Sequence, residues 1–510
     1  MNEEKEVKNG LASKIDSFFK VSESGSTIRT EIIAGIVTFL AMAYILTVNP
    51  GYLTGLYIRA AVPNTALWSS IFIATAISAI IGTLLMAFLA KMPFAQAPGL
   101  GLNAVTAGLV YGTLGFSYGN VMLLVLISGL IFIFLTTVPC GRNKENGQLI
   151  SLREKIFDGI PACVRNAITV GIGLFIAYIG LSSNGGIISN NSLVKFSQLF
   201  TEDGFSAVAP AIVCLIGFFS ITILAHFNVK GAVIIGILIA TVVGIPLGVS
   251  NIDTLIGKGD VTWKFWENFT NFFSFDTSKS VFAAAFVEGF DFSAVSAAKG
   301  AFGTIATTVI TFVMIDMFDT MGTVVGCASS ADMIDETGKP FHYNNIMLSD
   351  AIATCTGAMT GTSTVTTFVE SGSGIAAGGR TGLTALSTAC MFFLAIFLLP
   401  LFAFIPGAAT GAALIYVGVL MMGSVKNIDF KNIRSAAPAF MTLITMVCAA
   451  SITDGIGMGM VSYVFIECII YVVDIIKYAI NKEKYAKPQW VLSPVALVVA
   501  ALFIAYFCVK

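Results

Sequence analysis

The sequence predicts an all-α integral membrane protein whose chain crosses the bilayer fourteen times, as two inverted repeats of seven segments. Three observations support this fold class. First, the 510 residues are 56% hydrophobic and 11% charged, with a mean hydropathy of +0.87, whereas soluble domains contain about 25% charged residues. Second, apolar runs of membrane-spanning length recur along the whole chain. Third, motifs of the first half return in the second half.

The fourteen apolar runs form two groups of seven, separated by a more polar stretch at about 250–300. A further apolar run at 491–508 has no counterpart in the other half, and its topology stays open at this stage. The fourteen runs lie at 31–48, 68–90, 95–112, 119–139, 161–181, 206–225, 230–249, 301–325, 344–360, 363–378, 382–403, 407–424, 435–451 and 455–478.

The distribution of Lys and Arg predicts that the N-terminus lies in the cytoplasm. Basic residues gather after the fourth, twelfth and fourteenth runs, each time after an even number of crossings, and short loops rich in Lys and Arg face the cytoplasm. The stretch at 250–300 follows the seventh run and is mainly acidic, so we expect it outside. The basic residues are Arg142, Lys144, Arg153, Lys155, Lys426, Lys431, Arg434, Lys477, Lys482, Lys484 and Lys487.

The two halves share motifs in the same order, at similar offsets along the chain. Because seven is an odd number, the second group starts on the opposite side of the membrane, so the repeats are inverted. Inverted repeats are typical of secondary transporters, whose substrate site lies near the midplane between the halves. The matched motifs are IVTFLAMA (36–43) with VITFVMID (309–316), APGLGLNA (97–104) with ESGSGIAA (370–377), and IPACVRNAITVGIG (160–173) with IPGAATGAALIYVG (405–418).

The third and tenth runs are interrupted by Gly, Pro and β-branched residues. They read MPFAQAPGLGLNA and GTSTVTTFVESGSGIAAGGRTG, and we predict a short strand followed by a half-helix in each. Irregular backbone at membrane depth is tolerated where it is buried in protein or lines a cavity. The N-terminus of a half-helix offers free N–H groups and a positive dipole end to a polar ligand. The repeat alignment puts Ala97 and Glu370 at equivalent break points.

Two carboxylates lie in the apolar stretch FVMIDMFDTMGTVVG (312–326). Asp316 and Asp319 are three residues apart, so on a helix they share a face. A charged Asp at the bilayer centre costs about 2.5–3.5 kcal/mol, and the membrane segments hold almost no buried Lys or Arg to offset that cost. We therefore interpret Asp316 as a ligand or ion site, and Asp319 as either a ligand or an orienting group.

Three further polar residues are candidates for the same site. Glu370 lies at the second break, where a carboxylate can cap the half-helix, bind a ligand, or do both. Asn103 is the main polar side chain of the first break and either contacts the ligand or hydrogen-bonds backbone. Asp350 lies within the ninth run, and support and direct contact are equally compatible with its position.

The sequence indicates a transporter and not an enzyme. It has no Walker-type phosphate loop and no His beside a Ser or Cys nucleophile, so an ion gradient must supply the energy. His226 and His342 have no metal-ligand spacing, the nine Cys are scattered, and the net charge of −1 suggests no nucleic-acid partner. We therefore expect no cofactor and no metal.

Two carboxylates from different helices suit a flat, neutral, N–H-rich substrate, because each carboxylate accepts two parallel N–H hydrogen bonds. Nearby Phe rings could cover the face of such a heterocycle. A partly desolvated carboxylate can also bind a proton on one side of the membrane and release it on the other. This predicts coupling to H⁺. Na⁺ coupling stays an alternative, because the Thr-rich GTSTVTT offers hydroxyl and carbonyl oxygens.

Four motifs together resemble the AzgA-like branch of the nucleobase–cation symporter family, over nearly the whole chain. They are TEIIAGIVTFLAMAYILTVNP, APGLGLNA, FVMIDMFDTMGTVVG and GTSTVTTFVESGSGIAAGGRTGLT. The resemblance implies a plasma-membrane permease that imports hypoxanthine, guanine and adenine by proton symport. It also implies a core domain and a gate domain that move against each other in an elevator-like cycle, and members of the family often form homodimers through the gate domain.

The resemblance divides the chain into seven parts and assigns its site residues. Asn103, Asp316 and Glu370 match the family's substrate-site positions, with Gly101 and Asp319 in supporting positions. The parts are a cytoplasmic tail (1–30), the core domain (31–140 and 301–403), the gate domain (160–250 and 405–480), an extracellular linker (251–300) and a C-terminal segment (481–510).

Other functions of the same fold stay open. They are a uracil, xanthine or urate carrier, or a channel or anion exchanger, although carboxylates within the membrane disfavour anions.

Taken together, the predicted site has two overlapping sets of residues. The substrate-binding set is Asn103, Asp316, Glu370, Gly101, Ala97 and Ser371, and the proton-coupling or supporting set is Asp316, Glu370, Asp319 and Asp350.

Overall fold

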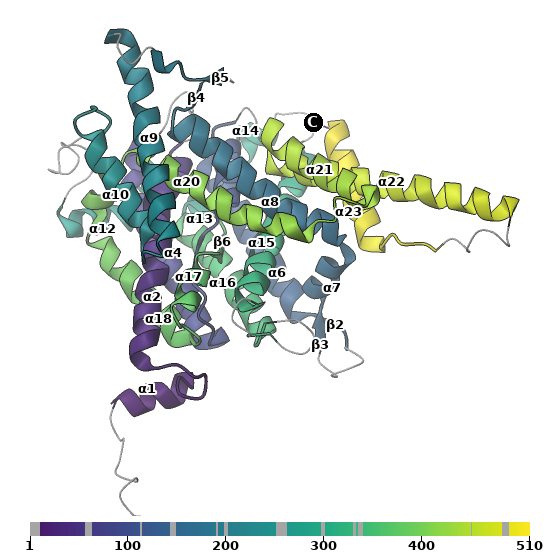
Figure 1. Ribbon diagram of the computed structural model, residues 1–510, viewed down its shortest axis with the longest axis horizontal. Helices are drawn as coiled ribbons and strands as arrows, with labels where there is room; N and C mark the ends of the chain where they lie inside the picture. Colours follow the sequence, from purple (N-terminus) through teal and green to yellow (C-terminus); the bar gives the residue numbers. More distant parts are fainter. Residues whose placement is uncertain are drawn as a thin grey trace, which may run out of the picture.

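The computed structural model is a helical protein whose longer helices form two adjoining bundles (Figure 1). Parts of the predicted tail (1–10), of the predicted linker (251–262 and 297–300) and of the C-terminal segment (482–488) lie outside the described residues. The described residues are 11–56, 64–112, 115–142, 149–189, 192–197, 202–250, 263–296, 301–329, 333–334, 340–449, 451–481 and 489–509.

Bundle one mixes helices from both halves of the sequence, because α2 packs on α18, and α16 packs on both α4 and α6. Buried Glu31, near the start of α2, accepts hydrogen bonds from the Arg380 N–H (2.9 Å) and the Thr381 hydroxyl (2.9 Å) and so ties α2 to the start of α18. The long helices of bundle one are α2 (Ile28–Met42), α3 (Ile45–Leu53), α4 (Trp68–Leu85), α6 (Tyr118–Thr137), α15 (Ala301–Ser329), α16 (Tyr343–Thr360) and α18 (Gly382–Ile396), and the short α19 (Leu399–Ala403) follows.

Two short strands meet inside bundle one, each followed by a helix. Ala97 and Thr366 are partners at the centre of this antiparallel pair. Gly99 is the N-cap of the first helix and Glu370 is the N-cap of the second, so Gly99 is the structural counterpart of Glu370. The predicted equivalence of Ala97 and Glu370 is therefore wrong by two residues, because small residues let the sequence match slide along the break. The elements are β1 (Gln96–Pro98), α5 (Leu100–Val110), β6 (Val365–Thr367) and α17 (Ser371–Ala376).

Bundle two is built around the crossing of α8 and α20, which come from the matched IP motifs. Pro161 and Pro406 are the N-caps of these helices. The aligned glycines Gly173 and Gly418 face each other at the crossing, where an added Cβ on Gly418 would lie 2.7 Å from the Gly173 carbonyl oxygen, and such small residues allow close packing. The helices are α8 (Ala162–Ile179), α9 (Glu202–His226), α10 (Ala232–Gly244), α20 (Gly407–Met421), α21 (Ile433–Cys448) and α22 (Ile452–Ile480).

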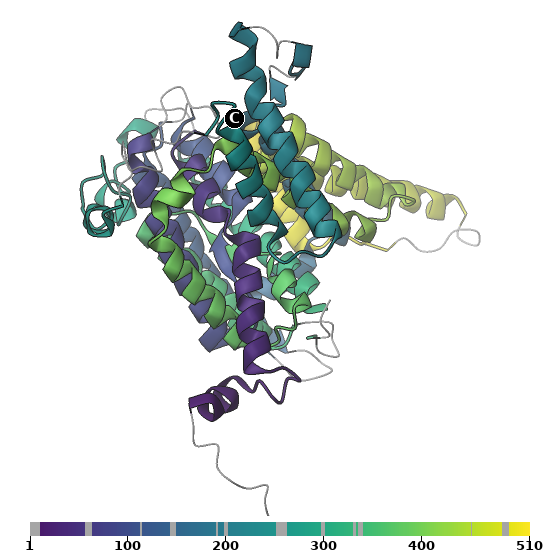
Figure 2. The same ribbon diagram turned by 60° about the vertical axis from the view of Figure 1, so that its left-hand side comes forward.

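Shorter elements surround the two bundles. Helix α1 lies below α2 at one end of the molecule in both ribbon views (Figures 1 and 2). The apolar run left over from the repeat forms α23, which packs on α22, α15 and α7. The elements are α1 (Leu11–Phe19), α7 (Leu152–Gly159), α12 (Phe265–Phe272), α13 (Ala284–Val287), α14 (Ser293–Ser296), α23 (Pro494–Val509), and the hairpins β2 (Pro139–Arg142) with β3 (Leu149–Ser151) and β4 (Ile188–Ser189) with β5 (Ser192–Leu193).

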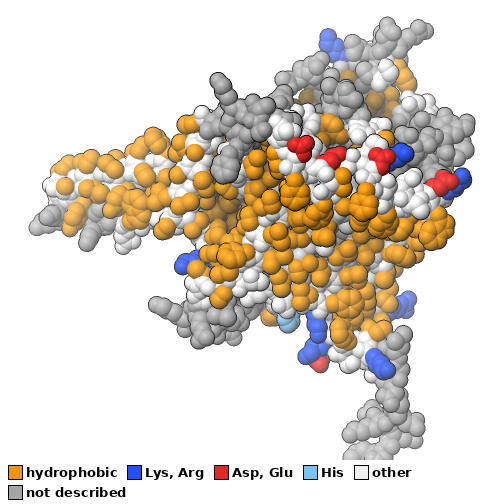
Figure 3. All heavy atoms as spheres, turned by 180° about the vertical axis from the view of Figure 1, so that it is seen from behind, with side chains coloured by type: hydrophobic (Ala, Val, Ile, Leu, Met, Phe, Trp, Pro, Cys, Tyr) orange, Lys and Arg blue, Asp and Glu red, His pale blue; other side chains and the backbone are white. Residues whose placement is uncertain are grey.

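The surface fits a membrane protein. Hydrophobic side chains form a broad belt around the middle, and charged side chains lie toward the two edges (Figure 3). Among the described residues, eight helical segments are long and apolar enough to cross a membrane, and five shorter apolar helices accompany them. The eight are Ile28–Leu53, Thr65–Ala90, Tyr118–Thr137, Ala162–Ser182, Val208–His226, Thr308–Ala328, Gly407–Asn427 and Ile452–Ile480.

Candidate functional site

A cavity of about 310 Å³ lies between the two bundles, at the tips of the two broken segments. One side of the cavity is formed by the two breaks, through Gly99, Leu100 and Gly101 of the first and residues 366–370 of the second. Helices α8, α15 and α20 supply the remaining walls. The volume is at the small end of the roughly 300–1,000 Å³ found for small-molecule sites. We call this space the first cavity.

Glu370 lines the first cavity and is 5% exposed. It occupies the N-cap position of α17, although its side chain makes no capping hydrogen bond to that helix. Instead the Tyr44 hydroxyl, from the junction between α2 and α3, donates to Glu370 Oε1 at 2.6 Å. Side-chain capping, the alternative to ligand contact, is therefore absent at Glu370. The second break delivers a carboxylate whose geometry is fixed by a neighbouring phenol.

Asp319, on α15, is the second carboxylate that lines the first cavity. It is half-buried, and the Thr366 hydroxyl of β6 donates to its Oδ2 at 3.3 Å. Asp319 and Glu370 are close enough for their charges to interact. A ligand in this cavity would thus meet two carboxylates that come from different segments of the chain.

Asp316 is fully buried and is not part of the cavity wall. Its Oδ2 lies 3.1 Å from the Thr354 hydroxyl of α16, and its Oδ1 has no hydrogen-bond partner among the described residues. The two Asp residues of α15 therefore have different surroundings. Asp316 faces the interior of bundle one, and Asp319 faces the space between the bundles.

A buried cation near these carboxylates comes from α7, outside the predicted membrane segments. Arg153, at the start of α7, is fully buried and forms an ion pair with Asp350 of α16 at 3.0 Å. The guanidinium also lies 4.4 Å from the centre of the Phe132 ring and donates to the Met347 carbonyl at 3.2 Å. The Thr320 hydroxyl donates to Asp350 at 2.6 Å. Asp350 is thus a buried partner of Arg153, away from the first cavity.

The N-terminus of α5 borders the first cavity. The N–H groups of Leu100 and Gly101 have no acceptor within the helix, because they belong to its first turn. Gly99 allows β6 to pass closely, since a Cβ at this position would lie 2.9 Å from the Thr366 hydroxyl oxygen. In the second break the equivalent N–H groups of Ser371 and Gly372 already donate to the carbonyls of Phe368 and Val369.

The other predicted residues lie behind this surface. Asn103 is fully buried, accepts a hydrogen bond from the Ser363 hydroxyl, and its Nδ2 has no partner in the described part of the chain. Ala97 is buried in β1. The Ser371 hydroxyl accepts from the Ala95 N–H at 3.0 Å and so joins the two breaks. Gly101 is the predicted small residue that does line the cavity.

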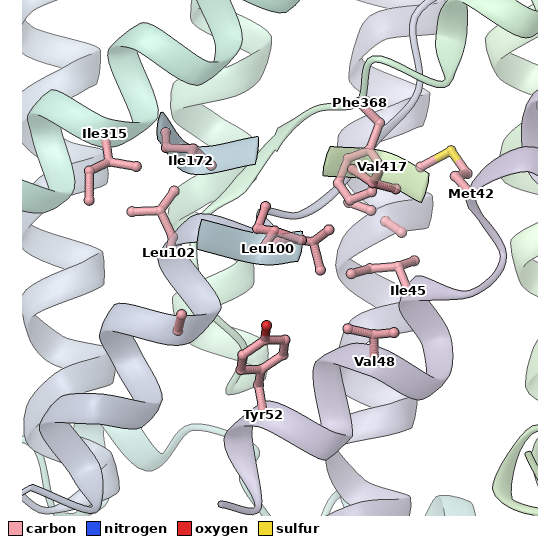
Figure 4. Close-up of a cluster of buried hydrophobic side chains, with 14 of the residues drawn as sticks. Met42, Ile45, Val48, Tyr52, Leu100, Leu102, Ile172, Ile315, Phe368 and Val417 are labelled. Atoms are coloured by element: carbon pink, nitrogen blue, oxygen red, sulfur yellow. The ribbon is translucent and has the colours of Figure 1, made fainter. Parts of the chain in front are cut away.

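Apolar side chains enclose the rest of the cavity. Figure 4 shows Leu100, Ile172, Phe368 and Val417 in one cluster of buried hydrophobic side chains, and these four residues belong to the cavity wall. Tyr44 and Phe368 are the aromatic rings of that wall among the described residues. A flat ligand could therefore contact both polar groups and rings. No group of three or more His, Cys, Asp or Glu residues suited to a metal occurs in the described ranges.

Sequence reasoning missed Tyr44, Thr366 and Arg153. Tyr44 directly follows the matched IVTFLAMA motif (36–43) and is a plausible signal, because a Tyr inside an apolar segment needs a hydrogen-bond partner. Thr366 lies in the predicted strand TVTTFV, where its alternate-face position could have been noticed. Arg153 carried no local signal, since its burial depends on how α7 docks under bundle one.

Comparisons with known proteins find similar chains over most of this sequence. The model of the Permease family matches residues 29–458. Adenine permease AdeP of Escherichia coli (strain K12) is 33% identical over 501 residues, 96% of this chain and 95% of that protein. Guanine/hypoxanthine permease PbuO of Bacillus subtilis (strain 168) is 34% identical over 460 residues, 88% of this chain and 94% of that protein.

Among solved structures, the transmembrane domain of a cyanobacterium bicarbonate transporter, BicA, has a similar fold. Its TM-score is 0.57 at 16% sequence identity, and the match covers 83% of this chain and 96% of that chain. Murine Slc26a9, an anion transporter in the inward-facing state, has a TM-score of 0.53 at 11% identity, with coverage of 92% and 74%. At such low identity these likenesses concern the fold alone.

Proposed function

The chain belongs to the Permease family, and from this premise we propose that it imports the purine nucleobases hypoxanthine, guanine and adenine by proton symport. It is a membrane transporter and not an enzyme. The observation that carries the proposal is the pairing of Asp319 and Glu370 in one cavity, together with the first-turn N–H groups of α5. Relatives named for adenine and for guanine and hypoxanthine support a purine as the substrate.

The geometry suits a flat base with hydrogen-bonding groups on its edges. Glu370 and Asp319 accept from ring and amino N–H groups, and a carboxylate can accept two parallel bonds. The N–H groups of Leu100 and Gly101 donate to a carbonyl oxygen or ring nitrogen of the base. Phe368 covers one face of the ring. Asp316, Asn103, Ser371, Ala97 and Asp350 support these groups from behind.

The electrostatics of the cavity supports the proposed coupling to protons. Neither Asp319 nor Glu370 forms an ion pair with a described Lys or Arg residue. Carboxylates inside a membrane protein need a counter-charge, and a proton taken up together with the neutral base supplies it. In this reading each cycle carries one base and at least one proton inward, and Na⁺ is not required.

In the proposed elevator-type cycle, the substrate site moves so that it opens alternately to the two sides of the membrane. Bundle one is the core domain that carries the substrate, and bundle two is the gate domain, which also forms a homodimer. The chain makes fourteen crossings of the plasma membrane as two inverted repeats, with the N-terminus in the cytoplasm. The first cavity reaches Cys327 on α15 and Ser424 after α20. Those ends face the cytoplasm in the proposed topology, so the cavity opens inward.

Uptake of labelled hypoxanthine tests this function in cells that lack their own purine carriers. We expect saturable uptake that a protonophore abolishes, that unlabelled adenine and guanine reduce, and that bicarbonate does not affect. Cells producing Glu370→Gln, at a matched amount of protein in the membrane, are the control for the site. Absence of uptake by the intact protein would refute purine import. Uptake that follows a sodium gradient and ignores the protonophore would refute proton symport alone.

A further inference from the structure

A second cavity reaches Glu370 from the opposite side. Its volume is about 360 Å³, and it lies between α2, the turn that joins α9 to α10, α17 and α20. It shares two residues, Glu370 and Leu420, with the first cavity. Glu370 together with Leu420 therefore forms the partition between two spaces, and the carboxylate of the partition borders both of them.

The second cavity has a wall suited to water. Lys230 and Asn228 lie at the α9–α10 turn, both exposed, and the exposed Ser373 of α17 also lines the cavity. Small residues, including Ala376 and Ala377, keep the space open. Polar groups that line a cavity of this size can hold ordered water. Both cavities have mainly apolar walls, but the first contains the Phe368 ring, which can cover the face of a base, whereas the wall of the second contains no described Phe or Trp.

We propose that the second cavity is the path by which the proton leaves Glu370 for the cytoplasm, separate from the path taken by the purine. This inference rests on the proposed proton symport. A base bound in the first cavity covers the side of Glu370 that faces Asp319, whereas water in the second cavity still reaches the carboxyl group. Release breaks the O–H bond of the Glu370 carboxylic acid and forms an O–H bond on a water molecule of the second cavity. The carboxylate remains, and no electron is transferred.

The groups around Glu370 fit this assignment. On the side of the first cavity it is faced by Tyr44, Asp319 and Cys327. On the side of the second cavity the titratable groups of the wall are Tyr416 and Lys230. A positive charge at the outer part of the second cavity favours the carboxylate that remains after release. The Tyr44 hydroxyl, which donates to Oε1, holds the carboxyl group in place during this transfer.

Ala376→Leu tests the path by filling the second cavity. Ala376 is exposed on the wall of that cavity and is absent from the wall of the first, so the larger side chain projects into the proposed water path. In reconstituted vesicles we expect net hypoxanthine uptake driven by a proton gradient to fall about tenfold, equivalent to about 1.4 kcal/mol in the barrier. Exchange of labelled for unlabelled hypoxanthine should stay near the wild-type rate, because the carrier can complete exchange with its proton bound.

The matched control is Ala501→Leu, the same chemical change on an exposed position of α23, which should affect neither mode. If Ala376→Leu lowers exchange as much as net uptake, or changes neither mode, the separate path is refuted. If the wild-type protein transports hypoxanthine in neither mode, the proposed function itself fails, which is a different result.

Thiol modification tests the same proposal without Ala376→Leu, in case that variant does not fold. The native Cys327 lines the first cavity, and Ser373→Cys introduces a thiol in the wall of the second. We expect saturating hypoxanthine to protect Cys327 from a small methanethiosulfonate reagent and to leave the thiol at 373 reactive, as measured by peptide mass spectrometry. Equal protection of both thiols would show that the base blocks a single shared path and would overturn the proposal.

Discussion

The break before α5 and the break before α17 present different groups to the first cavity. Both consist of a three-residue strand, an N-cap and a helix, and their strands pair with each other. The first break ends in Gly99 and offers backbone N–H groups, whereas the second ends in Glu370 and uses its first N–H groups within its own turn. The two breaks therefore have a similar backbone but divide the chemistry, with backbone donors in the first and a charged acceptor in the second.

This division explains why the ionisable groups are concentrated in the second half. A base with N–H groups and a carbonyl needs both acceptors and donors, and one broken segment supplies each kind. Asp319 on α15 adds a second acceptor beside Glu370. If the two breaks divide the chemistry in this way, side-chain substitutions in the second break should reduce transport more than side-chain substitutions in the first break.

The largest effect is expected for Glu370→Gln. The substitution removes the charged acceptor and the group proposed to carry the proton, while the amide can still accept from Tyr44. Loss of a hydrogen bond to a charged group costs about 1.5–3 kcal/mol, so we expect uptake to fall by roughly 10- to 100-fold or more. Uptake of labelled hypoxanthine, normalised to protein in the membrane, measures this. Near-normal uptake by the variant would remove Glu370 from the site.

Arg153→Met should have the next largest effect, through stability. Removing one partner of a buried ion pair costs about 3–5 kcal/mol, because the other charge stays buried and unpaired. Arg153 and Asp350 are both fully buried, so we expect a sharp fall in folded protein in the membrane. The double variant Arg153→Met with Asp350→Asn leaves no unpaired charge and should recover folded protein. Thermal unfolding in detergent measures both, and a double variant as unstable as the single one would contradict this account.

The sequence predicted the two breaks and Glu370 because Gly, Pro and β-branched residues act locally. It favoured Asp316 as the substrate-site carboxylate and gave Asp319 a supporting position, whereas Asp319 is the one that lines the cavity. Residues three apart on a helix differ by about 60° in direction, and the rotation of α15 against α16 decides which of them meets the cavity. Arg153 was assigned to a loop, since the depth of its guanidinium depends on how α7 docks. Tyr44 was overlooked because a Tyr in an apolar segment looks like ordinary core.

Substitutions of the two Asp residues of α15 distinguish a side chain that contacts the ligand from one that supports the site. Asp319→Asn should raise the half-saturating hypoxanthine concentration about tenfold, because a carboxylate on the cavity wall loses its charge and one oxygen acceptor. Asp316→Asn should leave the half-saturating concentration within about threefold of the wild-type value, since Asp316 faces Thr354 in the interior. Any effect of this substitution should be on the maximal rate of transport. Concentration-dependent uptake distinguishes them. The reverse order of effects would place Asp316 against the base.

The smallest effect is expected for Asn103→Ala, in the first break. Asn103 is buried and contacts Ser363 instead of the cavity, so its loss removes a side-chain hydrogen bond worth about 1 kcal/mol and leaves the free N–H groups of α5 unchanged. We expect the half-saturating hypoxanthine concentration to change by less than about threefold, with a modest fall in thermal stability. Ser363→Ala is the matched control, because it removes the other partner of the same bond and should have the same effect. A tenfold loss of apparent affinity in Asn103→Ala, but not in Ser363→Ala, would mean that the Asn103 amide turns to the base during transport. The two breaks would then share side-chain recognition, and the division between backbone donors and carboxylate acceptors would fail.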